Sequence, residues 1–136
     1  MKVVLLGFLY LFSSLAYAEI HRPQDFLKSI QGTKNEGEQI YQHFCINCHD
    51  RQPLIPLGAP RLAVDQDWKQ RVQQGLNLLF KHTDEGYNAM PPRGGCFECT
   101  DQQLILTIFY MLPEQYRKPL IKEEKSIKST DSKKNL

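Results

Sequence analysis

Apolar side chains recur at helical spacing in several short segments of the chain. One such segment, predicted as a helix over residues 34–44, places Tyr41 and Phe44 on a single face. Thr33 precedes this segment and Glu36 follows three residues later, which is the arrangement of a capping box. The pattern therefore predicts a first helix that begins just after Thr33.

Three more helices are predicted from the same periodicity. One is expected over residues 66–74, and another follows it around Leu79. The last begins at Thr100 and ends before Pro113, because proline cannot continue a helix. Residues 83–95 are rich in glycine and proline and are expected to form a loop. No segment alternates between apolar and polar residues as a β-strand would, so the predicted fold class is all-α.

The first 18 residues have the composition of a secretory signal peptide. Lys2 precedes an apolar run, and Ala16-Tyr17-Ala18 provides a small-residue cleavage signature, so we expect cleavage after Ala18. The apolar run is too short to cross a bilayer, which needs roughly 20 apolar residues. Export would place the mature chain in an oxidising compartment, the bacterial periplasm, where disulfides persist.

The remaining chain divides into three parts by composition. Residues 19–32 are polar and mixed, and they are expected to form an N-terminal arm. Residues 33–113 carry the predicted helices and form the compact domain. Residues 114–136 contain many lysines and few apolar residues, so we expect a flexible basic tail. Contact of this tail with anionic lipid or an acidic partner is the alternative to a solvated tail.

Composition limits the functional classes. With 41% hydrophobic and 24% charged residues, the chain as a whole is not disordered. The formal net charge of +2 gives no support for nucleic-acid binding, which usually requires a strongly basic surface. The four cysteines form two Cys-x-x-Cys pairs. In a short exported chain they indicate disulfides, a metal or a covalent cofactor.

The first cysteine pair is followed directly by a histidine. Its sequence, Cys45-Ile46-Asn47-Cys48-His49, is the attachment signature of c-type haem. Two thiols three positions apart on a helical turn can reach the two vinyl groups on one side of the porphyrin. The next residue, His49, then directs its imidazole at the iron. The motif predicts one covalently bound haem c, with His49 as the proximal iron ligand.

Three other interpretations of the cysteines are weaker. A thioredoxin-like redox pair belongs to a βαβ unit, and none is predicted. A four-cysteine zinc site would join both pairs, but Cys48 and Cys96 lie much further apart than the roughly 15–20 residues usual in such sites. Two independent disulfides would leave His49 without a role.

Met90 is the predicted distal iron ligand. It precedes Pro91 and Pro92, which restrict the backbone and can hold a thioether against the iron. His82 is the rival ligand, although its place near the end of a helix favours a surface or capping role. Met111 lies in the last helix and is expected to pack there. Ligation by histidine and methionine favours electron transfer over oxygen chemistry.

These motifs resemble those of class I c-type cytochromes, and more narrowly those of the bacterial cytochrome c5 group. The resemblance covers about residues 33–113. It is carried by Gly37-x-x-x-Tyr41-x-x-x-Cys45-x-x-Cys48-His49, Gly58-Ala59-Pro60, Trp68-x-x-Arg71-x-x-x-Gly75 and Ala89-Met90-Pro91-Pro92-Arg93-Gly94-Gly95-Cys96-Phe97-Glu98-Cys99. The last element is the most specific, because C-x-x-C-H alone marks any c-type cytochrome.

The resemblance implies a small helical fold wrapped around one haem. It implies a disulfide between Cys96 and Cys99 beside the Met90 loop. It also suggests that the carbonyl of Pro60 accepts a hydrogen bond from the ring N–H of His49, which would orient the imidazole.

The second cysteine pair can also be judged from its own residues. Thr100 follows Cys99 where a haem motif would have histidine, so a second haem is not predicted. An exported chain favours oxidation of the pair, and a redox-active dithiol is the alternative to a structural disulfide.

Three further expectations concern residues around the site. The resemblance implies that the first and last helices cross, with Gly37 allowing close approach to an aromatic such as Tyr110. Trp68 and Arg71 are candidates to bond a haem propionate, because a guanidinium matches the geometry of a carboxylate. A core aromatic and a solvated arginine are the alternatives for these two residues.

The leading functional hypothesis is a periplasmic mono-haem electron carrier without substrate turnover of its own. The expected partners are a donor such as a quinol:cytochrome c reductase and an acceptor such as a terminal oxidase, bound through small interfaces. No nucleic acid and at most peripheral membrane contact are expected. A haem enzyme or ligand sensor with a labile sixth ligand, such as a peroxidase-like protein, is the alternative. A zinc-binding interaction module is the third hypothesis.

Overall fold

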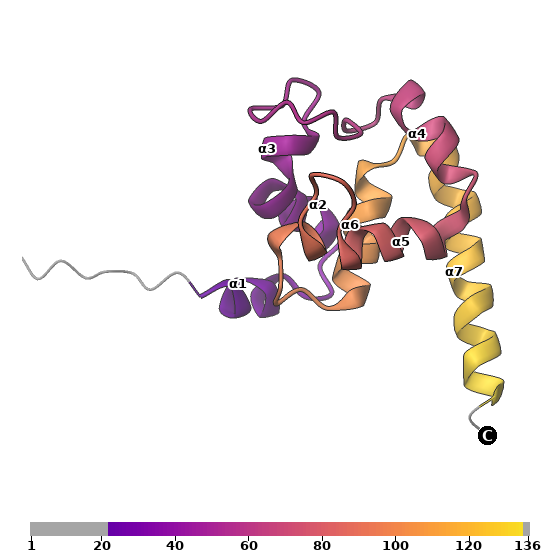
Figure 1. Cartoon of the computed structure of the whole chain (residues 1–136). Helices are drawn as coiled ribbons and strands as arrows, with labels where there is room; N and C mark the ends of the chain where they lie inside the picture. Colours follow the sequence, from indigo (N-terminus) through magenta and orange to yellow (C-terminus); the bar gives the residue numbers. More distant parts are fainter. Residues whose placement is uncertain (1–21, 135–136) are drawn as a thin grey trace, which may run out of the picture.

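The computed structural model describes residues 22–134, which form a set of packed helices (Figure 1). The predicted signal peptide, residues 1–18, lies outside the described residues. The helices are α1 (Pro23–Ile30), α2 (Glu36–Ile40), η1 (Tyr41–Cys45), α3 (Ile46–His49), α4 (Asp65–Val72), α5 (Gly75–Glu85), η2 (Pro92–Gly95), α6 (Asp101–Met111) and α7 (Glu114–Lys134). Between residues 22 and 134 there is no strand beyond one isolated pairing of Tyr87 with Met90, so the all-α prediction is confirmed. None of these helices is both long enough and apolar enough to span a bilayer.

Residues 36–49 form one continuous helical segment, in which η1 is a π-helical turn between α2 and α3. The segment begins later than predicted, and the expected capping box is absent. The Thr33 hydroxyl donates instead to the carbonyl of the last residue of α1, at 2.7 Å. The carboxylate of Glu36 accepts from the backbone N–H of Gly32 at 2.8 Å and from the Gln103 amide at 3.0 Å. The buried carboxylate of Glu36 therefore links α2 to α6 by a hydrogen bond.

Helix α6 begins as the sequence predicts. The Thr100 hydroxyl accepts from the backbone N–H of Gln103, and the Gln103 side chain accepts from the backbone N–H of Thr100, which completes a capping box. The Gln103 amide also donates to the carbonyl of Leu27 in α1. One buried side chain thus caps α6 and joins it to both α1 and α2.

The crossing of α2 over α6 brings two backbones into direct contact. A Cβ atom at Gly37 would overlap the carbonyl of Leu106, so only glycine fits at this position. Tyr110 packs against Tyr41, one turn further along, with ring centroids 5.3 Å apart. The predicted close approach is present, but it is made to the backbone of Leu106, and the aromatic ring meets Tyr41 instead.

Two clusters of buried apolar side chains hold the helices together. The larger cluster joins η1, α4, α5, α6 and α7 and contains Tyr41, Trp68, Leu76, Leu79, Ile108, Phe109, Met111, Leu112 and Leu120. The smaller cluster joins α1 to α2, α6 and the second cysteine pair and contains Leu27, Ile30, Ile40, Cys96, Cys99 and Leu104. The cavity described below lies between them, with walls from both.

Helix α1 lies within the predicted N-terminal arm. Its side chains Leu27 and Ile30 are only 3% and 5% exposed and pack in the smaller cluster. Three-residue spacing places both side chains on one helical face. Two apolar residues are too few to show a helical period in a segment that is otherwise polar, so the sequence did not predict this helix. Residues 22–32 are therefore part of the packed structure.

Helix α7 spans the region where the sequence predicts a flexible tail. Leu120 of this helix is 5% exposed and packs in the larger cluster. The Glu123 carboxylate accepts from the backbone N–H of Leu76 at 3.1 Å, at the start of α5. Residues 114–134, expected from the sequence to form a flexible tail, are helical in this structure, and a few apolar contacts and this cap attach the mostly charged helix to the domain.

Candidate functional site

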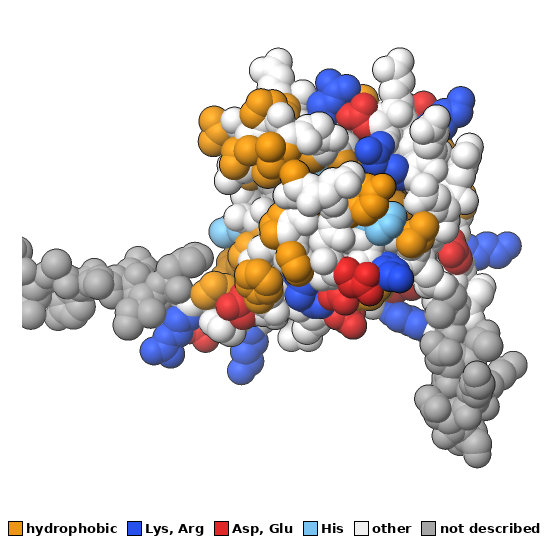
Figure 2. Space-filling model, viewed as in Figure 1, with side chains coloured by type: hydrophobic (Ala, Val, Ile, Leu, Met, Phe, Trp, Pro, Cys, Tyr) orange, Lys and Arg blue, Asp and Glu red, His pale blue; other side chains and the backbone are white. Residues whose placement is uncertain are grey.

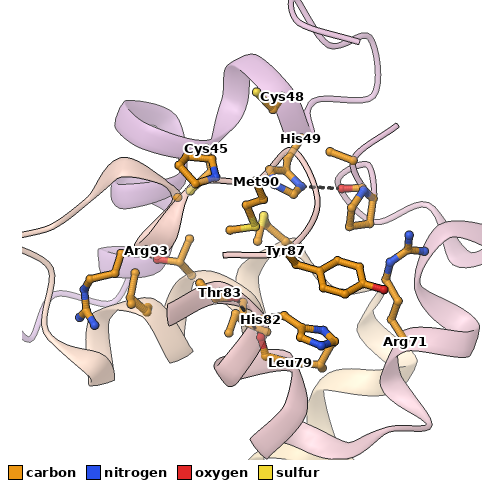
Figure 3. Close-up of a pocket in the computed structure, with 18 of the residues that line it drawn as sticks. Cys45, Cys48, His49, Arg71, Leu79, His82, Thr83, Tyr87, Met90 and Arg93 are labelled. Carbon is orange, nitrogen blue, oxygen red and sulfur yellow. Dashed lines mark hydrogen bonds between the residues drawn. The ribbon is translucent and has the colours of Figure 1, made fainter. Parts of the chain in front are cut away.

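A cavity of about 390 Å³ opens between the 45–49 segment, helices α4, α5 and α6, and the loop that follows α5 (Figure 3). Its volume lies within the range of about 300–1,000 Å³ usual for ligand sites. Figure 3 shows the Met90 side chain pointing into the cavity toward His49. The predicted site residues that line it are Cys45, Cys48, His49, Pro60, Trp68, Arg71, Met90 and Cys96.

The first cysteine pair lies at the junction of η1 and α3. Cys45 ends the π-helical turn, Cys48 lies three residues later, and neither forms a disulfide. Burial, followed by the charge of Cys48, raises the pKa of the Cys45 thiol to about 12. Because neither cysteine is in a disulfide, both thiols are free at the cavity wall, as a covalent attachment requires.

His49 is held by a single backbone acceptor. The residue is 6% exposed, and its Nδ1 atom lies 2.8 Å from the carbonyl oxygen of Pro60. Because a carbonyl only accepts, Nδ1 carries the proton and Nε2 has the free lone pair. Burial lowers the pKa of His49, although the Pro60 hydrogen bond opposes that shift. The ring therefore stays neutral near pH 7, the form in which imidazole binds a metal.

The segment after α3 carries Pro60 back to the histidine. The backbone N–H of Leu62 donates to the carbonyl of His49 at 2.7 Å, and the N–H of Ile55 donates to the carbonyl of Asn47 at 2.8 Å. These two backbone hydrogen bonds tie the segment to α3 on either side of Pro60. The next residue, Arg61, is held by its own contacts: its backbone N–H donates to the Asp67 carboxylate at 3.0 Å, and its carbonyl accepts from the Trp68 indole at 2.8 Å.

Met90 lies at the end of a tight turn. The backbone groups of Tyr87 and Met90 exchange two hydrogen bonds, at 3.1 and 3.0 Å. Gly86, with φ of 85°, lies so close that a Cβ would be 2.7 Å from the carbonyl oxygen of Met90. A Cβ at Gly94 would lie 3.4 Å from the Met90 methyl. Close backbone contacts on both sides therefore direct the thioether into the cavity.

The second cysteine pair forms a disulfide. Cys96 and Cys99 are bonded to each other and are only 1% and 4% exposed. They pack beside α1 in the smaller cluster. Because both sulfur atoms of this pair are bonded to each other, the alternative four-cysteine zinc site does not form.

Trp68 and Arg71 both line the cavity, but they differ in what they can offer a ligand. The Trp68 indole N–H donates to the carbonyl of Arg61 at 2.8 Å, so that donor is already used. Arg71 donates from one terminal nitrogen to the carbonyl of Asp67. Its guanidinium has five donors, so others remain for an anion. The geometry favours Arg71 over Trp68 as a partner for a carboxylate.

The rival ligands lie elsewhere on the cavity wall. The His82 ring stacks on Tyr87, with centroids 4.2 Å apart and planes inclined by 24°. Met111 is 4% exposed and packs in the larger cluster, as predicted. The stacking of His82 on Tyr87 could not be predicted from helical spacing, because Tyr87 lies in the loop after α5.

Arg93 is a polar residue of this region for which the sequence pattern predicts no role. Its side chain is 19% exposed and binds the Asp84 carboxylate of α5. It also donates to the carbonyl of Cys99 at 2.6 Å and to the Asp101 carboxylate at 3.1 Å. No sequence signal could reveal this arrangement, because the three acceptors lie on separate elements.

The donor set of the cavity fits a haem. An apolar space receives one imidazole nitrogen with a free lone pair from His49, one thioether from Met90, and two thiols from Cys45 and Cys48. Imidazole and thioether are the axial pair of electron-transfer cytochromes, and thiols at i and i+3 are the covalent attachment points. Arg71 adds a cationic group near the cavity rim that can receive a propionate.

Comparison with known proteins agrees with this geometry. A family model described as Cytochrome C oxidase, cbb3-type, subunit III, matches residues 32–111. Cytochrome c5 of Ectopseudomonas mendocina is 35% identical over 78 residues, which cover 56% of this chain and 86% of that protein. Cytochrome c5 of Azotobacter vinelandii is 33% identical over 75 residues, covering 54% and 87%. Cytochrome c-555 of Chlorobaculum tepidum is 31% identical over 80 residues, covering 56% and 71%. No solved structure matches the chain.

The matched segment ends where α6 ends, so it contains both cysteine pairs, His49 and Met90 but leaves out α7. The family model covers more than half of the chain, and both cytochromes c5 are covered over most of their own length. The chain therefore belongs to the class I c-type cytochromes, is c5-like, and is a haem electron-transfer protein with covalently bound haem c.

Proposed function

We propose that this chain is a periplasmic mono-haem electron carrier whose iron is bound by His49 and Met90 and whose haem is attached through Cys45 and Cys48. The observation that carries the proposal is the convergence of these four side chains on one apolar cavity. When bound, the haem supplies an iron that takes up and releases single electrons. The protein itself turns over no substrate.

The role of His49 follows from its second nitrogen. Donation from Nδ1 to the Pro60 carbonyl holds the ring in the tautomer that presents Nε2 to a metal. Since the acceptor is a backbone group, the ring can keep one orientation in both oxidation states. When the His49 ring keeps its orientation, the reorganisation energy of electron transfer is lower.

The role of Met90 is to occupy the distal position. A thioether ligand raises the reduction potential and leaves no open position for oxygen or peroxide. The paired backbone hydrogen bonds between Tyr87 and Met90 hold the ligand loop closed. The disulfide between Cys96 and Cys99 stiffens the next part of the same loop. This arrangement favours an electron carrier over the alternative haem enzyme or sensor.

The remaining predicted site residues have supporting roles in this proposal. Arg71 receives a haem propionate, because its guanidinium has unused donors at the cavity wall. Trp68 forms part of the apolar wall, since its N–H is bonded to Arg61. Contact between Trp68 and a propionate is therefore not part of the proposal.

The proposed partners are respiratory redox proteins, such as a quinol:cytochrome c reductase as donor and a terminal oxidase as acceptor. Three exposed apolar residues support a small docking face beside the cavity: Leu54, Ile55 and Leu57 are 80%, 43% and 56% exposed. Figure 2 shows hydrophobic side chains gathered over α3 and the loop that follows it. Such a face suits brief encounters between redox proteins. Any membrane contact is peripheral, and nucleic acid is not a proposed partner.

Absorption spectra of the exported protein test the proposal. Haem must remain with the chain after denaturing extraction, and replacing both Cys45 and Cys48 with alanine must release it. The ferric wild type should show the weak methionine-to-iron charge-transfer band. Met90→Ala should lose the band and bind carbon monoxide when reduced, while His82→Ala should keep it. A high-spin ferric wild type that binds peroxide would support the enzyme or sensor instead.

The location is tested separately. A chain with its first 18 residues intact should be recovered from the bacterial periplasm, with a mature N-terminus at Glu19. Recovery in the cytoplasm without haem would contradict the proposed export.

A further inference from the structure

The half-buried guanidinium of Arg93 links the ligand loop, residues 86–95, to the rest of the domain. Arg93 binds the Asp84 carboxylate near the end of α5. Its other terminal nitrogen donates to the Cys99 carbonyl at 2.6 Å and to Asp101 at the start of α6, at 3.1 Å. One side chain therefore joins the loop to the element before it and to the element after it.

The part of the loop that Arg93 holds is the part that touches Met90. Arg93 and Gly94 have φ values of 57° and 59°, which turn the chain sharply after the two prolines. That turn brings Gly94 against the Met90 methyl, where a Cβ would lie 3.4 Å away. The backbone of a non-glycine residue at positive φ is strained. The contacts of the Arg93 side chain offset that strain.

The disulfide cannot replace this anchor. Cys96 and Cys99 are bonded to each other across only three positions, so the bridge stiffens its own turn without tying the loop to α5. Among the described contacts, the hydrogen-bonded link from the loop segment 91–95 to α5 is the one between Arg93 and Asp84. Loss of that link frees the segment to move away from the cavity.

Charge and burial distinguish the partners of Arg93. The Asp84 side chain is 38% exposed and that of Asp101 is 70% exposed, whereas the Cys99 carbonyl belongs to a buried residue. An ion pair weakens as water and salt reach it. The bonds to Asp84 and the Cys99 carbonyl therefore hold the loop, and the bond to Asp101 contributes little.

We propose that Arg93 is a positioning residue that keeps the Met90 loop closed on the haem and so controls how readily the methionine leaves the iron. The inference rests on the proposed ligation by Met90. Arg93 does not touch the iron in this view. It sets the population of a loop-open state in which an external ligand can take the distal position.

The experiment compares holoprotein variants by titration of the ferric form with imidazole. Apparent affinity scales with the fraction of molecules that are in the open, binding-competent state. Arg93→Gln should therefore bind imidazole about tenfold more tightly than wild type, because it removes all three contacts. Asp84→Asn should show a smaller rise, and Asp101→Asn should resemble wild type. Arg93→Lys should restore part of the wild-type affinity, since a lysine can pair with only some of the acceptors.

Arg117 provides the matched control. Its guanidinium also donates to two backbone carbonyls, those of Leu112 and Tyr110, at 2.9 and 3.1 Å, and it does not line the cavity. Arg117→Gln should lower the melting temperature without changing the affinity for imidazole. If Arg117→Gln tightens imidazole binding as much as Arg93→Gln does, Arg93 has only a general structural role and the inference is overturned.

The remaining outcomes are also decisive. Unchanged imidazole affinity in both Arg93→Gln and Asp84→Asn overturns the inference. If Arg93→Gln fails to mature, Asp84→Asn against Asp101→Asn gives the same comparison. A wild type without the methionine-to-iron band, or a Met90→Ala variant that retains it, refutes the proposed ligation itself and is recognised before any titration.

Discussion

The Nδ1 atom of His49 lies 2.8 Å from the carbonyl oxygen of Pro60, and this hydrogen bond spans 11 positions of the chain. The bond decides which imidazole nitrogen faces the cavity. It depends on the course of the backbone between the two residues, because the acceptor is a carbonyl. The orientation of the His49 ring therefore depends on the rigidity of the loop that carries Pro60.

Replacing Pro60 with glycine should loosen that loop. Glycine adds conformational freedom to the unfolded chain, so we expect a loss of about 1 kcal/mol in the free energy of unfolding. Pro56→Gly, in the same loop but exposed, should cost a similar amount of stability. Only Pro60→Gly should change the reduction potential, measured by spectroelectrochemistry. Equal potentials in the two variants would show that the His49 contact is insensitive to the loop.

Gly37 should not tolerate even a methyl group. Gly37→Ala would force a Cβ into the Leu106 carbonyl, and such overpacking between two backbones should cost about 3 kcal/mol. Gly32→Ala is the control, since no atom lies within 4 Å of its Cβ and only its φ of +78° is unfavourable. It should cost about 1 kcal/mol. Thermal unfolding of the two holoprotein variants shows which one loses more stability. An equal loss of stability in both would argue against the close crossing of α2 and α6.

Helix α7 should contribute to the stability of the haem domain. Leu120→Ala removes a buried side chain from the larger cluster and should cost about 2–3 kcal/mol. Lys122→Ala, on the exposed side of the same helix, should change the free energy of unfolding by less than about 0.5 kcal/mol. Denaturant unfolding measures both. A Leu120→Ala variant as stable as Lys122→Ala would show that packing of α7 adds no stability to the domain, as expected of a flexible tail.

Asp67 should make the stability of the protein depend on acid pH. The Arg61 guanidinium hydrogen-bonds its carboxylate and holds the pKa of Asp67 below the usual value of 3.8. A lowered pKa stabilises the folded state above pH 3.8, and this contribution is lost as pH falls through the lowered value. Asp67→Asn should therefore be less stable than wild type at neutral pH, with a difference that shrinks in acid. Unfolding curves at several pH values test this, and a constant difference would contradict it.

The disulfide should be dispensable for haem attachment. Cys96 and Cys99 lie outside the attachment motif, so replacing both with alanine should leave the covalent haem and its Soret band in place. Closing so short a loop constrains little chain entropy, and we expect a loss of about 1–2 kcal/mol in stability. Spectra and thermal melts of the exported variant give both quantities. Complete failure of haem incorporation would mean that the bridge is needed earlier, during maturation.

Much of the site could be predicted from the sequence because its parts are local. The attachment motif needs two thiols and an imidazole within five consecutive residues. The turn around Met90 is indicated by the glycines and prolines that lie next to it. The all-α class and the start of α6 at Thr100 also follow from local periodicity and capping. The arrangement of Trp68 was harder to foresee, since its N–H donates to a carbonyl seven positions away.

The two terminal helices show where local pattern was insufficient. In α1, Leu27 and Ile30 are the buried pair, and among the side chains of α7 that the structure describes, Leu120 is the buried one. The sequence of a segment with so few apolar residues predicts a solvated chain. Its burial cannot be predicted locally, because it depends on a complementary surface supplied by distant residues. The expected capping role of Thr33 failed for a related reason, since Glu36 has a partner in Gln103 that lies 67 positions away.

By itself the sequence determined the chemistry of this protein: a covalent haem motif, an imidazole, a thioether in a stiff loop, and helices to surround them. These features depend on residues a few positions apart, so their physics is local. The tertiary structure decided which other groups meet: Glu123 and the start of α5, Glu36 and Gln103, Arg93 and Asp84. Such contacts arise only when packing of the apolar core brings separate elements together, because no local pattern encodes a partner on another helix.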